Sequence, residues 1–344
     1  MKTNNYLKPV IVIGLLFIAA IALKGQGTQI FEKEMEVSSN TTLTIDNKFG
    51  DIETSTWNKN RILVTVNVSG DFKNESEINK KVEIEFASST GEISLETIID
   101  GNLGSKSTQI NYTVKMPAAM NINFENEFGN LYLETLTGEA EIENKFGNVK
   151  LGTLKGNNNQ IDIKFGNLKI TDFNSGVIDI NNGNTEITKA RKLRLDAKFG
   201  NVELGKVKEA TVELKNGSFS IEEVDKLNID GAFGGLKIQE VTGELILDNS
   251  HGNTEINRIV ETASKIKIDN KFGKVKLGIS DEAAYNISCE VKMGSFYYPE
   301  ELANFDKMES SMMSKEYSGK LGKNPGNNHM EIESKNGDVV IFVY

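Results

Sequence analysis

Few residues of this 344-residue chain could carry chemistry. It has two histidines, His251 and His329, and a single cysteine, Cys289. A histidine-based catalytic triad or a histidine-rich zinc site would have to place one of the two imidazoles beside suitable partners. The pattern around each residue favours a structural role instead. We therefore expect no catalytic, cofactor-binding or metal-binding residues, no cofactor, and no enzymatic activity.

The three residues have structural explanations. His251 stands in a repeated motif at a place that phenylalanine fills in other copies, so it is interpreted as a corner packing residue. Cys289 falls in a column of apolar residues, which predicts a buried and unreactive thiol. His329 lies in a polar segment with methionines nearby, a combination that soft metals favour, although loop methionines are common without metals. Those methionines are Met312, Met313 and Met330.

Carboxylates offer the other chemistry. Parallel β-helices often carry polysaccharide lyases and hydrolases, whose acids and bases project from one solvent face. This chain has outward acids on its predicted strands, but alternating acids are also typical of any solvated strand. They include Glu143, Asp162, Asp179 and Glu213. The calcium-binding Gly-Gly-x-Gly-x-Asp repeat, the P-loop and the dinucleotide fingerprint are all absent.

The element that must position these residues is a repeat centred on Phe-Gly-Asn or Asn-Gly. Its copies read NEFGNLYL, NKFGNVKL, IKFGNLKI, INNGNTEI and so on, with successive glycines 17 to 21 residues apart. The glycines stand at 129, 147, 166, 183, 200, 217, 234, 252, 273 and 294, and outlying copies lie at Asn47 and Ser334.

Two apolar columns flank the glycine. The residues four after it and five before it are apolar in every copy, and polar residues alternate with them. This period of two is typical of strands with one buried face. Each repeat is therefore predicted to be strand, glycine corner, strand.

Such short repeats cannot close a core alone, so each needs neighbours about 4.8 Å away. We predict an all-β protein, a single-stranded β-solenoid with ~17-residue coils. An antiparallel meander is the alternative, because Asn-Gly also favours hairpin turns.

The corner residues predict their own packing. Glycine tolerates the positive φ of a tight reversal, and the asparagines after it could form an amide ladder from coil to coil. Before it stands phenylalanine, alternating with polar residues from 165 to 272. These rings predict aromatic packing at the corner with a two-coil sub-period; an aromatic strip that binds carbohydrate is the alternative.

The chain divides into five predicted segments. Residues 1–26 are a signal peptide, with an apolar run at 9–23 too short for a typical membrane span; cleavage near Gly25 to Gly27 is favoured over a retained anchor. Residues 27–117 are a β cap with the first long coils, and 118–298 are the regular repeats. An inserted polar loop at 299–330 and a closing strand pair at 331–344 complete the chain.

Charge limits the partners. The net charge of −10 comes from mixed acids and bases without a basic block, so nucleic acid is not expected as a partner. No second apolar stretch is long enough to span a membrane, so no membrane insertion of the mature chain is expected.

The segment VKMPAAMNINFENEFGNLYL from Val114, the KFGNVKL units and the closing EIESKNGDVVI resemble a bacterial β-strand-repeat family labelled as adhesins. It is similar to the adhesin-head GIN-domain proteins of Bacteroidetes. The resemblance covers residues 40 to 344 and implies a right-handed β-solenoid on an exported protein. It brings no catalytic residues.

These observations favour an exported β-solenoid of the periplasm, outer membrane or cell surface, acting as a structural or interaction module on an unknown protein or glycan. A carbohydrate-binding or polysaccharide-degrading β-helix is the second hypothesis. An accessory protein of an envelope-sensing system is the third.

Overall fold

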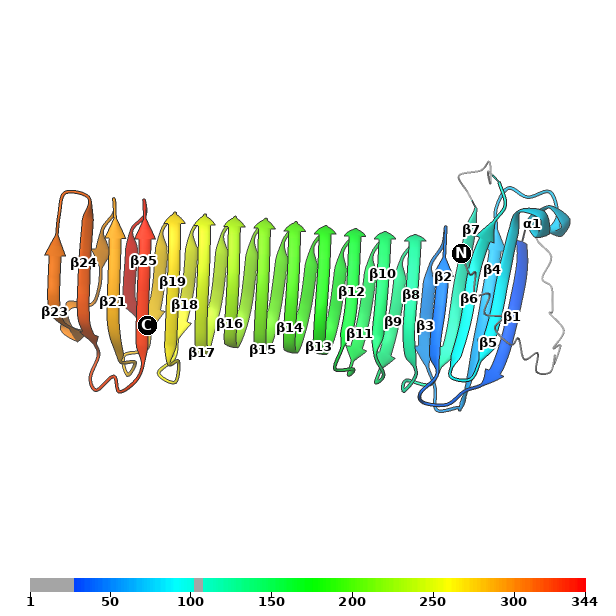
Figure 1. Ribbon diagram of the computed structural model, residues 1–344, viewed down its shortest axis with the longest axis horizontal. Coiled ribbons are helices and arrows are strands. Elements are labelled where there is room, and N and C mark those ends of the chain that lie inside the picture. Colours follow the sequence, from blue (N-terminus) through cyan, green and yellow to red (C-terminus); the bar gives the residue numbers. More distant parts are fainter. Residues whose placement is uncertain (1–27, 102–107) are drawn as a thin grey trace, which may run out of the picture.

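The protein is an elongated rod of stacked coils. The computed structural model describes residues 28–101 and 108–344, so the predicted signal peptide lies outside the described residues. Figure 1 shows the coils side by side along the long axis, with strands nearly perpendicular to it. The predicted all-β solenoid is confirmed.

Each coil contributes strand to two sheets. β8 (Asn121–Phe128) leads into the glycine corner, and β9 (Leu131–Leu136) leaves it. We call the sheet of strands leading into this corner sheet 1, and the sheet of strands leaving it sheet 2. The second reversal of the coil, the opposite corner, returns the chain to sheet 1. In the middle of the rod one long strand runs through the opposite corner, as β14 (Thr185–Phe199) does.

The order of strands follows from their pairing. Sheet 1 contains β5 (Val82–Ser89), β6 (Glu92–Ile99), β2 (Thr42–Asn47), β8, β10 (Ala140–Phe146), β12 (Asn159–Phe165), the second halves of β13 to β17, β19 (Lys265–Phe272), β25 (His329–Lys335), β21 (Tyr285–Lys292), β24 (Ser314–Leu321) and β23 (Ala303–Ser310). Sheet 2 contains β1 (Thr28–Glu36), β4 (Arg61–Ser69), β7 (Gln109–Met116), β3 (Ile52–Thr56), β9, β11 (Val149–Leu154), the first halves of β13 to β17, β18 (Thr254–Ile259), β20 (Val275–Ile279), β26 (Val339–Val343) and β22 (Phe296–Tyr297). The long strands are β13 (Leu168–Asn182), β14, β15 (Val202–Asn216), β16 (Phe219–Phe233) and β17 (Leu236–His251).

Parallel pairing in register holds the coils together. Ile170 faces Ile187, and Ile187 faces Leu204 in the next coil. The pairing of β14 with β15 is parallel throughout, whereas a meander would make it antiparallel. The antiparallel alternative is therefore wrong for the repeats, and antiparallel pairs occur at the two ends of the rod.

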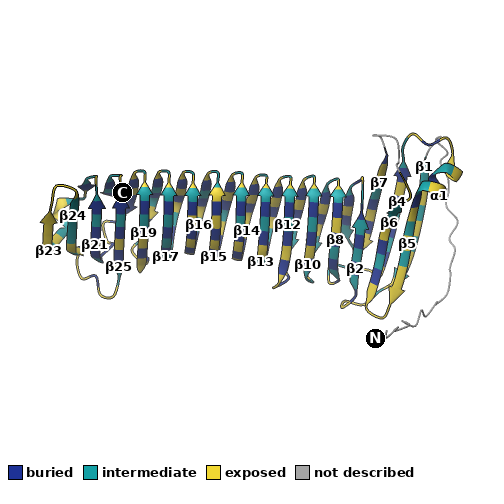
Figure 2. Ribbon diagram, turned by 45° about the horizontal axis from the view of Figure 1, so that its top comes forward, coloured by how far each residue is buried: buried dark blue, intermediate teal, exposed yellow. Residues whose placement is uncertain are grey.

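The core lies between the two sheets. The apolar columns predicted on either side of the glycine are buried, for example Leu195 and Leu204, each at most 3% exposed. Figure 2 shows buried residues alternating with more exposed ones along each strand. Alternation within single strands therefore produces one continuous core along the rod.

At the amino-terminal end the coils do not follow chain order. The first coil, β2 and β3, lies between β8/β9 and the later strands β6 and β7. Antiparallel strands then close both sheets: β5 pairs with β6, and β4 and β1 extend from β7. The single α-helix among the described residues, α1 (Glu75–Lys81), lies beside them, and Asn74 caps it by accepting a hydrogen bond from the Glu77 amide at 3.1 Å.

The carboxyl-terminal end repeats this arrangement. β25 and β26 enter between β19/β20 and β21/β22, so the last coil in sequence is an interior coil in space (Figure 1). The closing strand pair predicted at 331–344 thus exists, but it does not end the rod.

The structure differs from the inserted polar loop expected at 299–330. The segment contains the short 3-10 helix η1 (Glu300–Leu302) and a β-hairpin, β23 and β24, in which β24 pairs antiparallel with β21. The segment is polar because most side chains of β23 are exposed, and this polarity suggested a loop. The backbone of β24 nevertheless pairs with β21 and covers the edge of the sheet. The remaining segment boundaries stay predictions.

Within residues 28–101 and 108–344, no helix is both long enough and apolar enough to cross a membrane.

Candidate functional site

The glycine corners stack on one another at very close range. A Cβ placed on Gly200 would lie 1.9 Å from the carbonyl oxygen of Gly183, and the φ of Gly200 is 144°. The same contact recurs at Gly217, where a Cβ would lie 1.8 Å from the Gly200 carbonyl oxygen. The predicted positive φ is confirmed, and the close approach of neighbouring coils is a second reason for glycine.

The asparagines after these glycines form the predicted ladder. The Oδ1 atom of Asn148 accepts hydrogen bonds from the backbone amide and the side-chain Nδ2 of Asn167, both at 3.0 Å. Asn167 Oδ1 in turn accepts from the Asn184 amide at 3.0 Å. Asp51 takes the same role in an outer coil, where its carboxylate accepts from the Asn130 amide at 2.7 Å. The ladder ties each corner to the next from Asp51 to Ser218.

The phenylalanines before the glycines stack face to face. The ring centroids of Phe146 and Phe165 lie 5.0 Å apart with planes inclined by 2°. His251 continues the stack farther along, 4.7 Å from Phe233 and 4.9 Å from Phe272. We call the row of corner residues before the glycine the aromatic ridge. In spatial order it consists of Phe49, Phe128, Phe146, Phe165, Asn182, Phe199, Asn216, Phe233, His251, Phe272, Asn336 and Met293.

These rings are exposed, which modifies the expected corner packing. Most of them pack on a neighbouring ring, but their exposure ranges from 38% at Phe49 to 56% at Phe199. Figure 2 shows the exposed tips of sheet 1 strands in a row along one side of the rod. The side chains point outward because the apolar columns on either side already fill the core.

The stacking determines which parts of the rings are available. Phe146 has a ring on both faces, Phe128 at 5.0 Å and Phe165 at 5.0 Å. A pyranose stacks on a ring face, and here the faces are covered while the edges are free. The ridge geometry therefore does not fit a flat carbohydrate platform along Phe128 to Phe165.

A row of carboxylates runs parallel to the ridge on sheet 1. Asp179 faces Asp162 on one side and Asp196 on the other, in direct register. Every strand of sheet 1 contributes one acid to this acidic row. Its members are Glu85, Glu96, Asp46, Glu125, Glu143, Asp162, Asp179, Asp196, Glu213, Asp230, Asp248, Asp269, Glu333, Glu290, Glu316 and Glu309.

Like charges in register affect the acidity of the row. Partial burial raises the pKa of Asp179, and the neighbouring carboxylates of Asp196 and Asp162 raise it further. Burial likewise raises the pKa of Asp248. Glu143 is the opposite case, because a hydrogen bond from Lys164 at 2.6 Å lowers its pKa.

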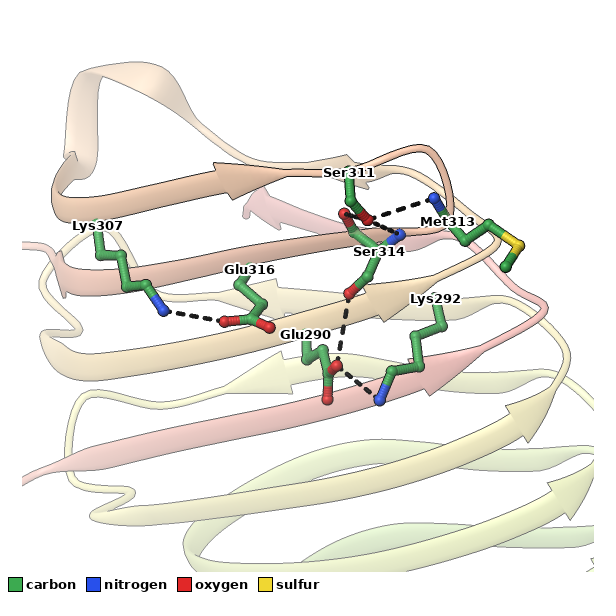
Figure 3. Close-up of polar contacts among 7 residues, drawn as sticks. All are labelled: Glu290, Lys292, Lys307, Ser311, Met313, Ser314 and Glu316. Atoms are coloured by element: carbon green, nitrogen blue, oxygen red, sulfur yellow. Dashed lines mark hydrogen bonds and ion pairs between the residues drawn. The ribbon is translucent and has the colours of Figure 1, made fainter.

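Lysines moderate this repulsion. Between the acidic row and the ridge lies a second row, two residues before each glycine, where Lys145, Lys164 and Lys271 stand. Figure 3 shows the end of the rod, where Lys292 pairs with Glu290 at 2.6 Å and Lys307 with Glu316 at 3.0 Å. Exposed pairs of this kind contribute little individually, so the row keeps an acidic character.

The acidic row does not resemble a glycosidase centre. Such an enzyme sets two carboxylates apart from their surroundings, with one of them tuned as the acid. Here each coil supplies a carboxylate at the same position in the register, so no pair is set apart by its placement. Among the described residues, no three histidine, cysteine, aspartate or glutamate side chains are placed to hold a metal ion together.

The remaining sequence candidates are separated in space. Cys289 is 1% exposed in the core, and burial raises the pKa of its thiol to about 12, as expected for an unreactive cysteine. His329 begins β25 at the opposite corner, where its amide donates to the Ser264 carbonyl. Met313 instead lies by the glycine corner, its carbonyl accepting from the Met293 amide. A seven-residue strand separates the two corners, so the soft-metal grouping of His329 with Met312 and Met313 is wrong.

Sequence reasoning noted four of these acids without recognising their alignment. Glu143, Asp162, Asp179 and Glu213 all stand four residues before a glycine. Reading that column through every copy reveals the acidic row, and reading two residues before the glycine reveals the lysines. Both rows were missed because the polar residues of each strand were interpreted only as its solvent-exposed face.

Comparison with known proteins finds a family match for part of the chain. Residues 173–341 match the model of the family described as Toastrack DUF4097. This region is similar to the Toastrack family. The expected resemblance to a bacterial β-strand-repeat family is thereby confirmed. The matched residues begin in β13 and end in β26. A search of curated proteins found no match.

Several solved structures are similar to this chain at low identity. A protein of Bacteroides fragilis described as a candidate adhesin is 14% identical with a TM-score of 0.39, covering 61% of this chain and 97% of its own. One from Parabacteroides distasonis, described in the same way, is 15% identical with a TM-score of 0.38, covering 72% and 96%. One from Parabacteroides merdae is 11% identical with a TM-score of 0.37, covering 72% and 95%.

Proposed function

We propose that the chain is an exported interaction module of the cell envelope or surface, of the adhesin type and without catalysis, and that the aromatic ridge is its contact surface. The exposed ring edges from Phe49 to Phe272 carry this proposal. A phenylalanine side chain buries on the order of 150–250 Å², so seven half-exposed rings present on the order of 700 Å². Exposed apolar patches on monomers are usually no larger than roughly 600 Å² unless they bind something.

The rod suits this role because it holds the ridge straight. The asparagine ladder and the parallel pairing fix each corner relative to the next, so the rings need little ordering on binding. A preorganised surface loses less conformational entropy when a partner docks. Export is supported by the apolar run at 9–23, and location at the envelope follows from the proposed role.

Two measurements test the proposal. Fractionation of the source cells should place the chain outside the cytoplasm. The purified chain should be retained on whole cells, and a ridge variant with Phe128, Phe146 and Phe165 changed to Ser should lose at least tenfold in retention. The matched control changes exposed residues of the opposite corner, Arg191 and Lys208, to Ser. A cytoplasmic chain, or equal retention of both variants, would contradict the proposal.

A further inference from the structure

The aromatic ridge reads nearly the same in both directions from Phe199. Toward the amino-terminal end the next corner residues are an asparagine followed by three phenylalanines. Toward the carboxyl-terminal end they are an asparagine, a phenylalanine, a histidine and a phenylalanine. The two half-ridges are Asn182, Phe165, Phe146, Phe128 and Asn216, Phe233, His251, Phe272.

The spacing of the ridge determines which kind of partner can contact all of its rings. Its residues recur with each coil, and its stacked rings, such as Phe146 and Phe165 at 5.0 Å, offer edges rather than faces. A surface that contacts every ring must repeat at the same interval. A second copy of this chain does so by construction, and an antiparallel copy centred on Phe199 places phenylalanine against aromatic residue and Asn182 against Asn216.

The row two residues before each glycine, which contains the lysines, is consistent with a two-fold axis at Phe199. In an antiparallel pair related by a two-fold axis across the ridge, the sheet 1 sides of both copies lie on the same side of the contact. Lys164 of one copy then faces Ala232 of the other, and Lys145 faces Ser250. Only Lys198, at the axis, meets its own copy among the neighbouring coils. On the three coils on either side of the axis, each lysine therefore faces an uncharged residue.

We propose that two copies of this chain associate ridge to ridge, antiparallel, about a two-fold axis at Phe199. The inference rests on the proposed function to the extent that both use the aromatic ridge as a contact surface. Seven rings expose on the order of 700 Å² per copy, close to the ~800 Å² per partner of a standard interface. Antiparallel pairing gives a closed dimer, because the same patch is used on both copies.

Sedimentation velocity of the full chain across a concentration series tests the association. We expect a monomer–dimer equilibrium, and Phe199→Glu should weaken it at least tenfold because the ring contact at the axis is lost and a carboxylate must be desolvated in its place. The matched control is Lys208→Glu, an exposed change on the opposite corner. The apolar segment at 9–23 is common to all variants, so association through it would not respond to Phe199→Glu.

Cross-linking tests the arrangement independently of affinity. Cys289 is 1% exposed, so an introduced thiol is the reactive one. With a short bismaleimide, Phe199→Cys should cross-link to itself, whereas Phe128→Cys should cross-link to Phe272→Cys in a mixture and not to itself. Circular dichroism confirms that each variant is folded. Lys208→Cys serves as the background.

The outcomes separate the two proposals. A monomer at all concentrations overturns the dimer, and self-cross-linking of Phe128→Cys overturns its antiparallel arrangement. If the ridge variant still loses retention on cells while the chain stays monomeric, the proposed function stands and the dimer falls. If the chain forms the dimer but is found in the cytoplasm, the dimer stands and the proposed function falls.

Discussion

A Cβ on Gly234 would lie 1.7 Å from the carbonyl oxygen of Gly217 in the preceding coil. Gly235, the next residue, has no atom nearer than 3.9 Å to its own added Cβ. Two adjacent glycines thus differ completely in what their missing side chain permits. The first fixes the distance between coils, while the second stands where other copies have the ladder asparagine.

This difference predicts opposite responses to alanine. Gly234→Ala must push two backbones apart and hold φ near 153°, so we expect it to destabilise the fold by more than about 2 kcal/mol. Gly235→Ala should change stability by less than about 0.5 kcal/mol. Thermal unfolding followed by circular dichroism measures both. Equal melting temperatures would show that the glycine stack is not tightly packed.

The asparagine ladder predicts a graded response at Asn167. Asn167→Ala removes the acceptor for the Asn184 amide and should cost roughly 1 kcal/mol. Asn167→Asp keeps that acceptor, as Asp338 does for the Ser295 amide at 2.9 Å, so it should cost less than the alanine change. Chemical denaturation at pH 7 compares the two. A larger loss with aspartate would mean that repulsion between the new carboxylate and the Asn148 Oδ1 atom outweighs the retained acceptor.

The acidic row predicts a pH-dependent gain from Asp179→Asn. The folded-state pKa of Asp179 is raised above its usual 3.8, so the folded protein binds more protons there and becomes more stable as the pH falls. At pH 7 the charge is a penalty, and removing it should stabilise the fold by roughly 0.2 to 1 kcal/mol. The gain should disappear as the pH drops through the raised pKa. Melting temperatures from pH 7 to pH 3 follow it.

Glu143→Gln is the matched change on the same row. The folded-state pKa of Glu143 is lowered by Lys164, so its contribution is present above the usual 4.5 and is lost as the pH falls through the lowered value. This variant should lose stability at pH 7, and the loss should vanish in acid. Changes of the same sign at both positions would show that the row acts only through its total charge.

Much of this fold could be predicted from columns in the sequence, because a coil that stacks in register repeats its side-chain directions. Leu195 and Leu204 are buried where their columns placed them. The coil order at the ends was not predictable in this way. Asn47 and Ser334 head recognisable copies, but their motif does not say which neighbour they pair with. That choice depends on long-range pairing, such as that of Asp269 with Glu333.

The ridge was only partly predictable for a related reason. Alternation of Phe165 with Asn182 and Phe199 was visible, whereas ring exposure depends on how far the corner projects beyond the apolar columns. The acidic row required knowing that β6, β24 and β23 extend sheet 1, since their acids belong to no copy of the motif.

The interior position of the last coil predicts an unusual response to truncation. Ending the chain after Asn324 removes β25 and β26, which lie between β19/β20 and β21/β22. A terminal coil could be lost at the cost of its own contacts. Here the deletion also exposes the facing edges of Ile268 and Cys289, both buried in the intact rod, and separates β21 from the stack. We expect residues 280–324 to become sensitive to protease while the coils before β19 stay resistant.

The control removes Tyr344 alone, whose hydroxyl makes a long 3.4 Å hydrogen bond to the Ile259 carbonyl, and should leave the digestion pattern unchanged. Full resistance of β21 in the truncated chain would mean that β21 can pair directly with β19 and that the last coil is dispensable.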